Sequence, residues 1–370
     1  MGREKLGIAK KNKNDEFYTT LETINKELIS DEYRKQLKDK VIYCNCDDAK
    51  HSQFWRYFVM NYDRLELRGL ITTYFPKDGE DKSYMLEINE EIIKGLMSKH
   101  KIDRLELFSK FQNVDEYYFP EKKEIFGDAK YKAGDFRSKD SIDLLKNKDV
   151  VVITKPPFSL FREYVSQLMK YKKKFLIIGS INAISYKEIF PLLKENKIWL
   201  GVSISSGDRE FRVPNLEKLV RVPGVRWFTN LKHNKRNELL YTHKKYKGNE
   251  LNYPKYHNYD AINIDKTKDI PVDYFGIMGV PISFMDKYNS KQFEIVALGI
   301  TGNCEFLNNY KSEIYKDGIA TGKFTMNCKG CVYYKWDKEV NKDIKPKYRN
   351  VENNDFYIAP YSRVLIKRIK

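Results

Sequence analysis

The feature that most constrains the fold is an apolar run, residues 150–153, that leads directly into a loop stiffened by two prolines. A continuous apolar run of this length predicts a strand covered on both faces, as in a parallel sheet. The loop, residues 154–158, reads Thr-Lys-Pro-Pro-Phe, and residues 159–170 carry apolar side chains at helical spacing, with Ser159 as the expected N-cap. Open α/β sheets bind ligands where such strands end, so we expect this loop to belong to a ligand site.

Further apolar runs alternate with helical patterns on both sides of this loop. We expect strands at residues 41–46, 69–75, 175–179 and 198–202, and helices at residues 21–37, 53–59 and 140–145. Such alternation is typical of βαβ units with right-handed crossovers. The sequence therefore predicts an α/β fold built on a doubly wound, mostly parallel sheet.

Changes of pattern divide the chain into four segments. A basic polar arm, residues 1–14, precedes the alternating domain of residues 15–210, in which the charge-dense residues 76–124 form a peripheral insertion. Residues 212–259 mix bases, aromatics, proline and glycine without clear periodicity, and we expect residues 211–290 to form a separate recognition lobe. Residues 291–370 contain strand-like runs at 293–298 and 363–369, which we expect to return and complete the sheet.

Net charge narrows the class of partner. Lys and Arg number 68 against 51 Asp and Glu, a net charge of +17. This excess favours a polyanion, and nucleic acid is the first expectation. No apolar run approaches the roughly 18 residues of a membrane span, and residues 1–14 are too polar for a signal peptide. We expect a cytoplasmic protein without membrane association.

The five cysteines are too few and too scattered for a secreted disulfide framework. Cys328 and Cys331 have the two-residue gap of half a zinc knuckle, but no second Cys or His pair stands at finger or ribbon spacing. We expect a glycine-containing turn here and no metal, with structural zinc as the alternative.

Four short motifs follow one another along the chain. They are Asp-Glu-Phe-Tyr-Thr at 15–19, the predicted strand ending in Cys-Asn-Cys-Asp-Asp at 44–48, Gly-Asp-Phe at 134–136, and the loop at 154–158 with its continuation to residue 164. In this order they resemble the EcoRI-type DNA adenine-N6 methyltransferases, over roughly residues 10–300. The resemblance implies a Rossmann-like, S-adenosylmethionine-dependent methyltransferase fold with a DNA-recognition lobe. It also implies site-specific methylation of a flipped adenine in duplex DNA, within a restriction-modification system of bacterial or phage origin.

The resemblance further implies where the cofactor binds, with S-adenosylhomocysteine as its product. Aromatic and hydroxyl groups of the first motif would close over the methionine end, a carboxylate after the first strand would pair with the ammonium, and the Gly-Asp-Phe turn would hold the adenine. The expected contacts are Phe17, Tyr18, Thr19, Asn45, Asp47, Asp48, Asp135, Phe136 and Thr154. Taken singly, each motif also fits a capped turn with a core aromatic residue.

The loop at 154–158 departs from the family at one position, because Lys155 stands where the family has asparagine. The family loop accepts the N6 hydrogens of the flipped base through asparagine and a proline carbonyl, here that of Pro156, while Phe158 stacks on the ring. A lysine ammonium has three donors and no acceptor. It also opposes the cationic sulfonium, at a cost of about 3 to 4 kcal/mol for charges 4 to 5 Å apart.

We therefore expect the catalytic loop of Lys155, Pro156, Pro157 and Phe158 to work at a rate reduced by about three decades or more. Two other arrangements would lessen the loss. In the first, Lys155 is buried in a dry pocket and carries no charge. In the second, Lys155 turns outward and contacts a DNA phosphate.

A basic stretch rich in tyrosine follows the alternating domain, at residues 231–258. Interleaved cations and aromatics suit phosphate tracking, although a charge run also fits a simple solvated face. The expected DNA contacts are Lys11 and Lys13 of the arm together with Lys232, Arg236, Lys244, Lys245 and Lys247.

Two other functions remain open from the sequence. One is a non-catalytic DNA-binding protein that retains the methyltransferase fold. The other is methylation of cytosine N4 or of RNA adenine, because the loop chemistry concerns exocyclic amines in general. In the leading interpretation the partner is double-stranded DNA and the protein is a monomer, with a dimer left open.

Overall fold

The structure is a computed structural model that describes residues 18–45, 47–75, 82–203, 209–212, 220–307, 310–339, 341 and 344–369. Internal contacts divide the chain into two compact units. The first comprises Met1–Ile189 and Lys197–Asn234, and the second comprises Phe190–Asn196 and Lys235–Lys370. Among the described residues, no helix has the length and apolarity that a bilayer crossing requires.

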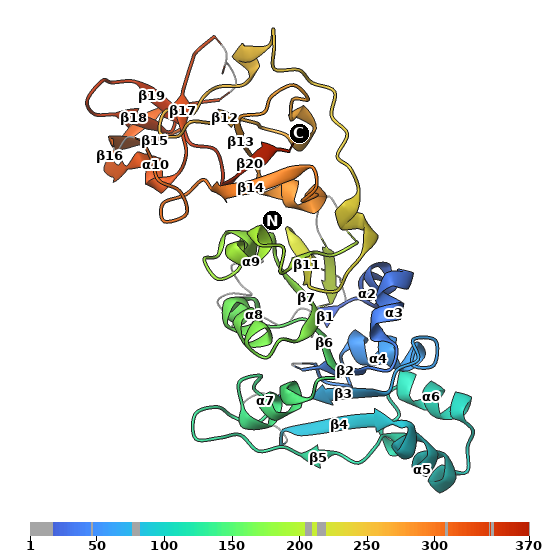
Figure 1. Cartoon of the computed structure of the whole chain (residues 1–370). Coiled ribbons are helices and arrows are strands. Elements are labelled where there is room, and N and C mark those ends of the chain that lie inside the picture. Colours follow the sequence, from blue (N-terminus) through green and yellow to red (C-terminus); the bar gives the residue numbers. More distant parts are fainter. Residues whose placement is uncertain are drawn as a thin grey trace. The chain divides into compact units, whose positions relative to one another are not determined.

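An eight-stranded sheet with the order β5-β4-β3-β2-β6-β7-β11-β8 forms the centre of the first unit (Figure 1). Its strands are β2 (Val41–Cys44), β3 (Gly69–Thr73), β4 (Tyr84–Asn89), β5 (Lys123–Glu124), β6 (Val150–Thr154), β7 (Lys174–Ser180), β8 (Trp199–Leu200) and β11 (Val225–Thr229). The four central strands, β3, β2, β6 and β7, are parallel. The strands on either side pair antiparallel, so the sheet is mixed around the predicted parallel centre.

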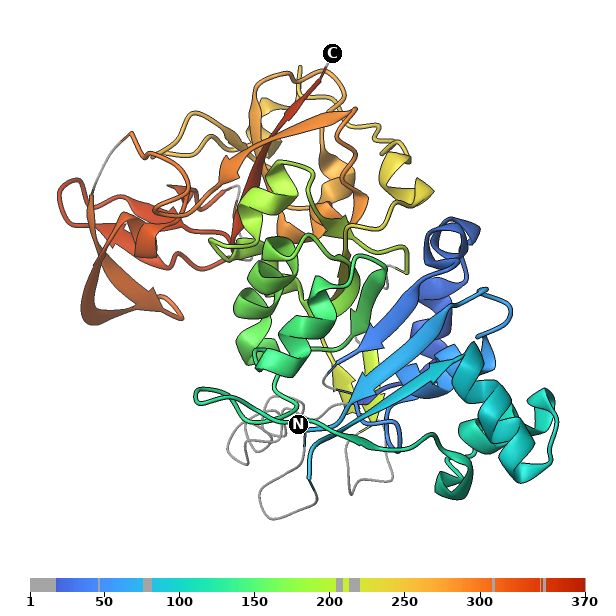
Figure 2. The same ribbon diagram turned by 60° about the horizontal axis from the view of Figure 1, so that its bottom comes forward.

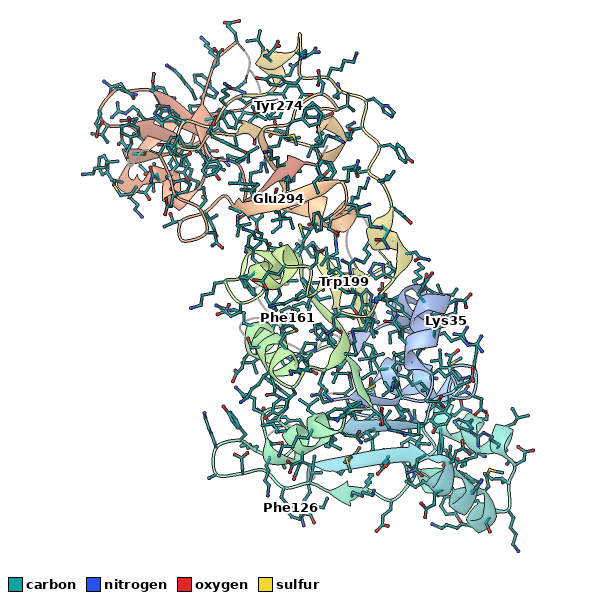
Figure 3. All side chains as sticks on the ribbon, in the orientation of Figure 1. Lys35, Phe126, Phe161, Trp199, Tyr274 and Glu294 are labelled. Carbon is teal, nitrogen blue, oxygen red and sulfur yellow. The ribbon has the colours of Figure 1, made fainter. Side chains whose placement is uncertain are left out.

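Helices cover both faces of this sheet. Figures 1 and 2 show α7 (Lys139–Lys146) and α8 (Phe161–Lys170) on one side, and α4 (Gln53–Met60), α5 (Glu90–His100) and α6 (Arg104–Gln112) on the other. Every residue of β3, β6 and β11 is buried, as expected of strands covered twice. Phe161, labelled in Figure 3, lies so close to β7 that a Cβ on Gly179 would meet its ring at 2.4 Å.

Two predicted helices begin or break at other residues than expected. The helix expected at 21–37 is two helices, α2 (Leu21–Leu28) and α3 (Asp31–Leu37), separated at Ser30. Ser159 is not the N-cap of α8, which begins at Phe161 after the 3-10 turn η2 (Phe158–Leu160). The Pro157 carbonyl accepts the Leu160 N–H at 3.1 Å and closes this turn, so the helix starts later.

Two predicted boundaries within the first unit were wrong. Residues 76–124 include β4, which pairs along the whole of β3, and α5 packs on it, so they are not a peripheral insertion. The sheet of the first unit does not end near residue 211, because β11 lies antiparallel between β7 and β8. Antiparallel strands at the sheet margins break the βαβ rhythm on which the prediction depended.

A second, three-stranded sheet contains the first described residues of the chain. It consists of β1 (Tyr18–Thr19), β9 (Arg209–Arg212) and β10 (Val220–Val222), with β1 antiparallel to β9. Nearby, the buried carboxylate of Glu27 on α2 accepts the N–H groups of Val202 and Ser203, each at 2.7 Å, and the Tyr33 hydroxyl at 3.0 Å. The N-terminal segment is thereby held to the residues that follow β8.

The second unit contains two sheets of its own. One has the order β12-β13-β20-β14 and the other β16-β15-β18-β19-β17. Their strands are β12 (Ile262–Asn263), β13 (Ile277–Pro281), β14 (Phe293–Leu298), β15 (Lys311–Lys316), β16 (Ile319–Met326), β17 (Tyr334–Lys335), β18 (Tyr348–Asn350), β19 (Phe356–Ile358) and β20 (Arg363–Arg368). The short helices are α9 (Phe190–Lys194) and α10 (Asn327–Gly330).

The strands expected at 293–298 and 363–369 both form, but they do not complete the eight-stranded sheet. They are β14 and β20, which pair antiparallel with each other in the four-stranded sheet. Ile295 lies opposite Ile366, and both are buried. Apolar alternation predicts a strand but does not name its partner, which explains the error.

Candidate functional site

The candidate site lies at the carboxyl ends of β2 and β6, which are parallel neighbours with Ile42 opposite Val151. In the sheet, β3 lies on the outer side of β2, and β7 lies on the outer side of β6. The chain therefore leaves β2 and β6 in opposite directions. Adjacent strands whose connections leave in opposite directions open a crevice at their carboxyl ends, where α/β sheets bind ligands. Three of the four sequence motifs meet at this edge.

Asp47 and Thr154 join the ends of the two strands. The Thr154 hydroxyl is hydrogen-bonded to the Asp47 carboxylate and, at 2.5 Å, to the backbone carbonyl of Asn45. The Ser52 hydroxyl donates to the other Asp47 oxygen at 3.1 Å and also caps the start of α4. The first-strand motif and the proline loop are thus fixed to each other by side chains.

Burial raises the pKa of Asp47 to about 7. The Thr154 hydroxyl, the Lys155 charge and the Ser52 hydroxyl oppose this rise by favouring the ionised form. A buried carboxyl group with a pKa near neutrality, at a ligand-binding edge, is suited to pairing with a cationic ligand group.

Asn45 connects the same cluster to the Gly-Asp-Phe motif. The Tyr164 hydroxyl, from α8, donates to the Asn45 side-chain oxygen, and the Tyr164 ring meets Phe136 edge-to-face at 4.9 Å. The Asn45 Nδ2 and the Thr19 hydroxyl are buried without a hydrogen-bond partner among the described residues. Both groups can donate a hydrogen bond.

The turn that carries Asp135 lies against the end of β3. Gly134 has a φ of +81°, and a Cβ there would lie 2.5 Å from the Tyr74 carbonyl oxygen, so only glycine fits. Both Asp135 oxygens bind the Arg137 guanidinium, at 2.9 and 2.8 Å, and Arg137 also contacts Glu163 at 3.1 Å. A carboxylate offers about four acceptor positions, so Asp135 can accept a further hydrogen bond.

Phe136 itself is a core residue in this structure. Its side chain is 2% exposed and packs against Tyr164. Its backbone carbonyl accepts the Gln167 side-chain amide at 2.7 Å. The predicted stacking of Phe136 on the cofactor therefore stays a prediction.

Asp48 is held by its own turn. Its carboxylate binds the His51 ring at 2.7 Å and accepts the Tyr84 hydroxyl at 3.1 Å. The Tyr84 ring in turn packs against Tyr74 at 5.1 Å. Asp48 thus supports the turn before α4 and ties it to β4, at the same edge of the sheet as Asp47.

The proline loop presents a cation beside an aromatic ring. The Lys155 ammonium lies 5.3 Å from the centroid of the Phe158 ring, and both side chains are half-buried. The Lys155 backbone N–H donates to Asp47. Pro156 is buried and Pro157 half-buried. The loop is therefore anchored to the Asp47 cluster at its start.

The remaining predicted residues fall in different parts of the chain. Lys232 is exposed in the first unit, and Lys244, Lys245 and Lys247 are exposed in the second. Arg236 is half-buried, donates to Asn196 at 3.2 Å, and has its pKa lowered by burial. Lys11, Lys13 and Phe17 lie outside the described residues, and for Tyr18 only the backbone is described.

Three residues of the site escaped the sequence analysis. Ser52 has the pattern of an N-cap, but its contact with Asp47 depends on how the chain turns between the two residues. Tyr164 fits the apolar spacing of residues 159–170 and its ring is buried on α8, but its hydroxyl reaches Asn45. Arg137 follows the Gly-Asp-Phe motif directly, and a basic neighbour of a predicted ligand carboxylate is a signal that could have been used.

Among the described residues, no group of three or more His, Cys, Asp or Glu side chains is placed to hold a metal ion. Cys328 and Cys331 lie in and after the turn of α10, where residues 327–330 all have positive φ. Burial raises the pKa of Cys328 to about 12, so this thiol stays protonated at neutral pH.

The first unit is an α/β domain whose central parallel strands end in a buried polar cluster. Comparison with protein families matches residues 5–369 to the family described as adenine-specific methyltransferase EcoRI. Type II methyltransferase M.EcoRI of Escherichia coli is 45% identical over 325 residues, which cover 81% of this chain and 94% of that protein. The chain belongs to the EcoRI adenine-specific methyltransferase family.

Two mycoplasma proteins are also similar. Type II methyltransferase M.MpnI of Mycoplasma pneumoniae is 37% identical over 304 residues, 78% of this chain and 83% of its own. Type II methyltransferase M.MgeORF184P of Mycoplasma genitalium is 36% identical over 303 residues, 78% of this chain and 84% of its own. No solved structure matches the chain.

Proposed function

We propose that the protein is a site-specific DNA adenine-N6 methyltransferase of a restriction-modification system that uses S-adenosylmethionine. The observation that carries the proposal is the Asn45, Asp47 and Thr154 cluster, which joins the proline loop to the first-strand motif at one sheet edge. Family membership and relatives named Type II methyltransferases support it.

The proposed fold is Rossmann-like and doubly wound. Its support is the parallel order β3-β2-β6-β7, with helices on both faces and a change of direction between β2 and β6. The antiparallel β11 inserted beside β7 extends the sheet without covering that edge. We assign residues 15–234, apart from 190–196, to the catalytic part, and the second unit to DNA recognition.

The residues at this edge fit the cofactor chemically. Asp47 can pair with the ammonium of the methionine end, and the buried Asn45 Nδ2 and Thr19 hydroxyl can donate to its carboxylate. Asp135 accepts three hydrogen bonds from Arg137 and retains about one acceptor position for an adenine amino group. When bound, S-adenosylmethionine supplies a methyl group on a cationic sulfur. The protein's part is to fix the cofactor and the acceptor amine in line.

The proline loop would hold the target base. Adenine N6 is paired and stacked in a duplex, so the base must leave the helix to be methylated. Phe158 is half-buried at the loop's end and offers a stacking face. The stiff loop would place the Pro156 carbonyl where it accepts one N6 hydrogen.

Lys155 would impair this chemistry. Its ammonium gives the base no acceptor, and it places a positive charge where positive charge develops on N6. The position of Lys155 over the Phe158 ring, at 5.3 Å, supports this, because a base stacked there would meet the ammonium. We propose an enzyme with low turnover and an intact cofactor site.

The exposed lysines of the second unit would contact phosphates. Lys244, Lys245 and Lys247 lie on an irregular segment whose fold is fixed by Asp273, which accepts the backbone N–H groups of Tyr246 and Lys247 at 2.6 and 3.2 Å. Tyr246 packs against Tyr274, labelled in Figure 3, at 4.6 Å. A fixed backbone with exposed cations suits contact with phosphates at any sequence.

One other function has specific support. The same Lys155 cation over Phe158 favours a protein that binds DNA and cofactor but does not transfer methyl groups. Two measurements separate these proposals. Calorimetry with S-adenosylhomocysteine tests the cofactor site, and tritiated methyl transfer to duplex DNA and to RNA tests turnover and substrate. Saturable binding with transfer to DNA supports the methyltransferase, binding without any transfer supports the non-catalytic protein, and no binding contradicts both.

A further inference from the structure

A two-stranded ribbon projects from the five-stranded sheet of the second unit, and we call residues 311–326 the ribbon (Figure 2). Its strands, β15 and β16, pair antiparallel from Lys311 opposite Met326 to Lys316 opposite Ile319. The two residues between them, Asp317 and Gly318, have φ values of 54° and 88°, as a tight hairpin turn requires. The ribbon is therefore a well-specified hairpin.

One strand of the ribbon is exposed on both faces. β16 is the edge of the sheet, and all its residues except the half-buried Thr325 are exposed. The exposed residues of β16 include three large apolar ones, Ile319, Phe324 and Met326, whose side chains are 72%, 51% and 47% exposed. A long apolar edge strand promotes aggregation unless it has a partner, and other proteins shorten or cover such edges. The exposure therefore indicates a binding surface.

The ribbon also has a pronounced irregularity. The pairing register shifts between Glu313 and Tyr315, and Gly322 on the opposite strand has a φ of +68°. The Thr321 hydroxyl donates to the Ile314 carbonyl at 2.7 Å and stabilises the shift. Bulges of this kind increase the right-handed twist of a strand pair.

The exposed charges of the ribbon favour a polyanion. Lys311, Lys316 and Lys323 are exposed, against one exposed acidic residue, Asp317. The other carboxylate, Glu313, is buried and bound to Arg349 at 2.8 Å. The ribbon thus offers cations, apolar groups and hydroxyls together, which are the side chains that read base edges and phosphates.

We propose that the ribbon enters the major groove of duplex DNA and reads the target sequence. This inference rests on the proposed DNA methyltransferase function and names its sequence-reading element. The major groove, about 12 Å wide, admits a two-stranded ribbon. Phe324 and Ile319 supply apolar contacts for thymine methyl groups, and Lys323 supplies donors for guanine. The Thr321 hydroxyl donates its proton to the Ile314 carbonyl, so toward a base it acts as an acceptor. The element lies outside residues 211–290, where recognition was expected.

The test is sequence selection by the full-length protein from a library of random duplexes, with S-adenosylhomocysteine present. The variant is Phe324→Ser with Lys323→Gln. Its matched control is Ile344→Ser with Lys338→Gln, two exposed positions of the same unit outside the ribbon, with Lys338 beyond the far edge strand β17. We expect the ribbon variant to lose about 10- to 100-fold in preference for the selected sequence. The control should keep that preference, and non-specific binding should change by only a few fold.

A second measurement does not depend on substitutions. Bromouracil carries its bromine in place of the thymine methyl, which lies in the major groove. Irradiation of the complex should cross-link such a duplex to a peptide from residues 311–326. Cross-links confined to other parts of the chain would overturn the assignment.

The outcomes separate this inference from the proposed function. If the wild-type protein retains no duplex, both fall. If it selects one sequence and the ribbon variant selects that sequence equally well, only the ribbon assignment falls. A dimer in light scattering that Phe324→Ser removes, together with unchanged selection, would show that the edge contacts a second copy and would also overturn the proposal.

Discussion

The hydroxyl of Thr154, the last residue of β6, is hydrogen-bonded to the carboxylate of Asp47, just beyond the end of β2. The same hydroxyl contacts the Asn45 carbonyl, so one proton is shared between two acceptors when Asp47 is ionised. A protonated Asp47 supplies the second proton and satisfies both contacts. This arrangement agrees with the raised pKa of Asp47, about 7, whose largest cause is burial.

The affinity for S-adenosylhomocysteine should therefore depend on pH. The ligand ammonium pairs only with ionised Asp47, so affinity should rise about tenfold per pH unit from 5.5 toward 7 and then level off. Calorimetry across this range measures the effect, and Asp47→Asn should give a weak, flat profile. A flat profile in the wild-type protein would show that Asp47 does not face the ligand.

The raised pKa of Asp47 also predicts how the stability of the ligand-free protein changes with pH. Folding raises the pKa of Asp47, so its contribution to stability is complete below the ordinary value of 3.8. That contribution is lost as the pH rises through about 7. Ligand should consequently raise the thermal midpoint more at pH 8 than at pH 5.5.

Lys155→Asn should increase methyl transfer to duplex adenine by at least about 10³-fold, with little change in S-adenosylhomocysteine affinity at pH 8. Asparagine supplies an acceptor for N6 and removes the cation that lies over Phe158. Lys155→Met is the matched control, because it removes the charge without adding an acceptor, and it should recover only a small part of the rate. Equal, low rates for all three proteins on random duplexes would refute the catalytic role of the loop.

Phe158→Ala in the Lys155→Asn background should lower the transfer rate again, by about 10- to 100-fold, because the flipped base loses its stacking face. Phe158→Tyr keeps a ring at this half-buried position and should retain most of the rate. Single-turnover kinetics measure both. If alanine and tyrosine behave alike, the ring at 158 does not stack on the base.

DNA affinity should fall steeply with salt, and Lys244→Gln, Lys245→Gln and Lys247→Gln should each reduce the slope of log affinity against log salt by about one. These lysines are exposed on a backbone segment held by Asp273. Lys99→Gln, exposed on α5 of the first unit, is the control and should leave the slope unchanged. Fluorescence anisotropy with a labelled duplex gives the slopes, and unaltered slopes in all four variants would exclude these phosphate contacts.

Glu27→Gln should lower the free energy of unfolding by about 2 to 4 kcal/mol. The buried carboxylate accepts the backbone N–H groups of Val202 and Ser203 and two hydroxyls, and an amide cannot accept them all. Glu22→Gln on the same helix is the control, because its ion pair with Lys26 is exposed and its loss should leave the free energy of unfolding nearly unchanged. Urea unfolding measures both variants. A similar loss of unfolding free energy in the two would show that the buried hydrogen bonds of Glu27 do not stabilise the fold.

Several elements could be predicted because local pattern specifies them. The strands at β2, β6 and β7 and the helix α4 follow from apolar runs and capping residues that are contiguous in sequence. The motif order was equally informative, since Asn45, Asp47 and Thr154 do meet at one edge. Partners of strands were less predictable, as β14 and β20 show, because pairing depends on register with residues far away.

The site shows the same division. Side chains next to a motif in sequence, such as Asp135 and Phe158, could be named from it. Tyr164 could not be assigned its hydrogen bond to Asn45, since 119 residues separate them and only the packing of α8 brings them together. The ribbon was missed although Asp317 and Gly318 form a strong hairpin signal, because its exposure is visible only in three dimensions.

The sequence by itself determined the parallel centre of the sheet, the proline loop and the family, since apolar periodicity, proline and short motifs act through neighbouring residues. Tertiary structure alone decided that Asp47 is buried and titrates near neutrality, that Phe136 packs in the core, and that β16 is left uncovered. Burial and desolvation are properties of the whole packed chain. For that reason a carboxylate and a strand that look ordinary in the sequence become the features by which this protein can be tested.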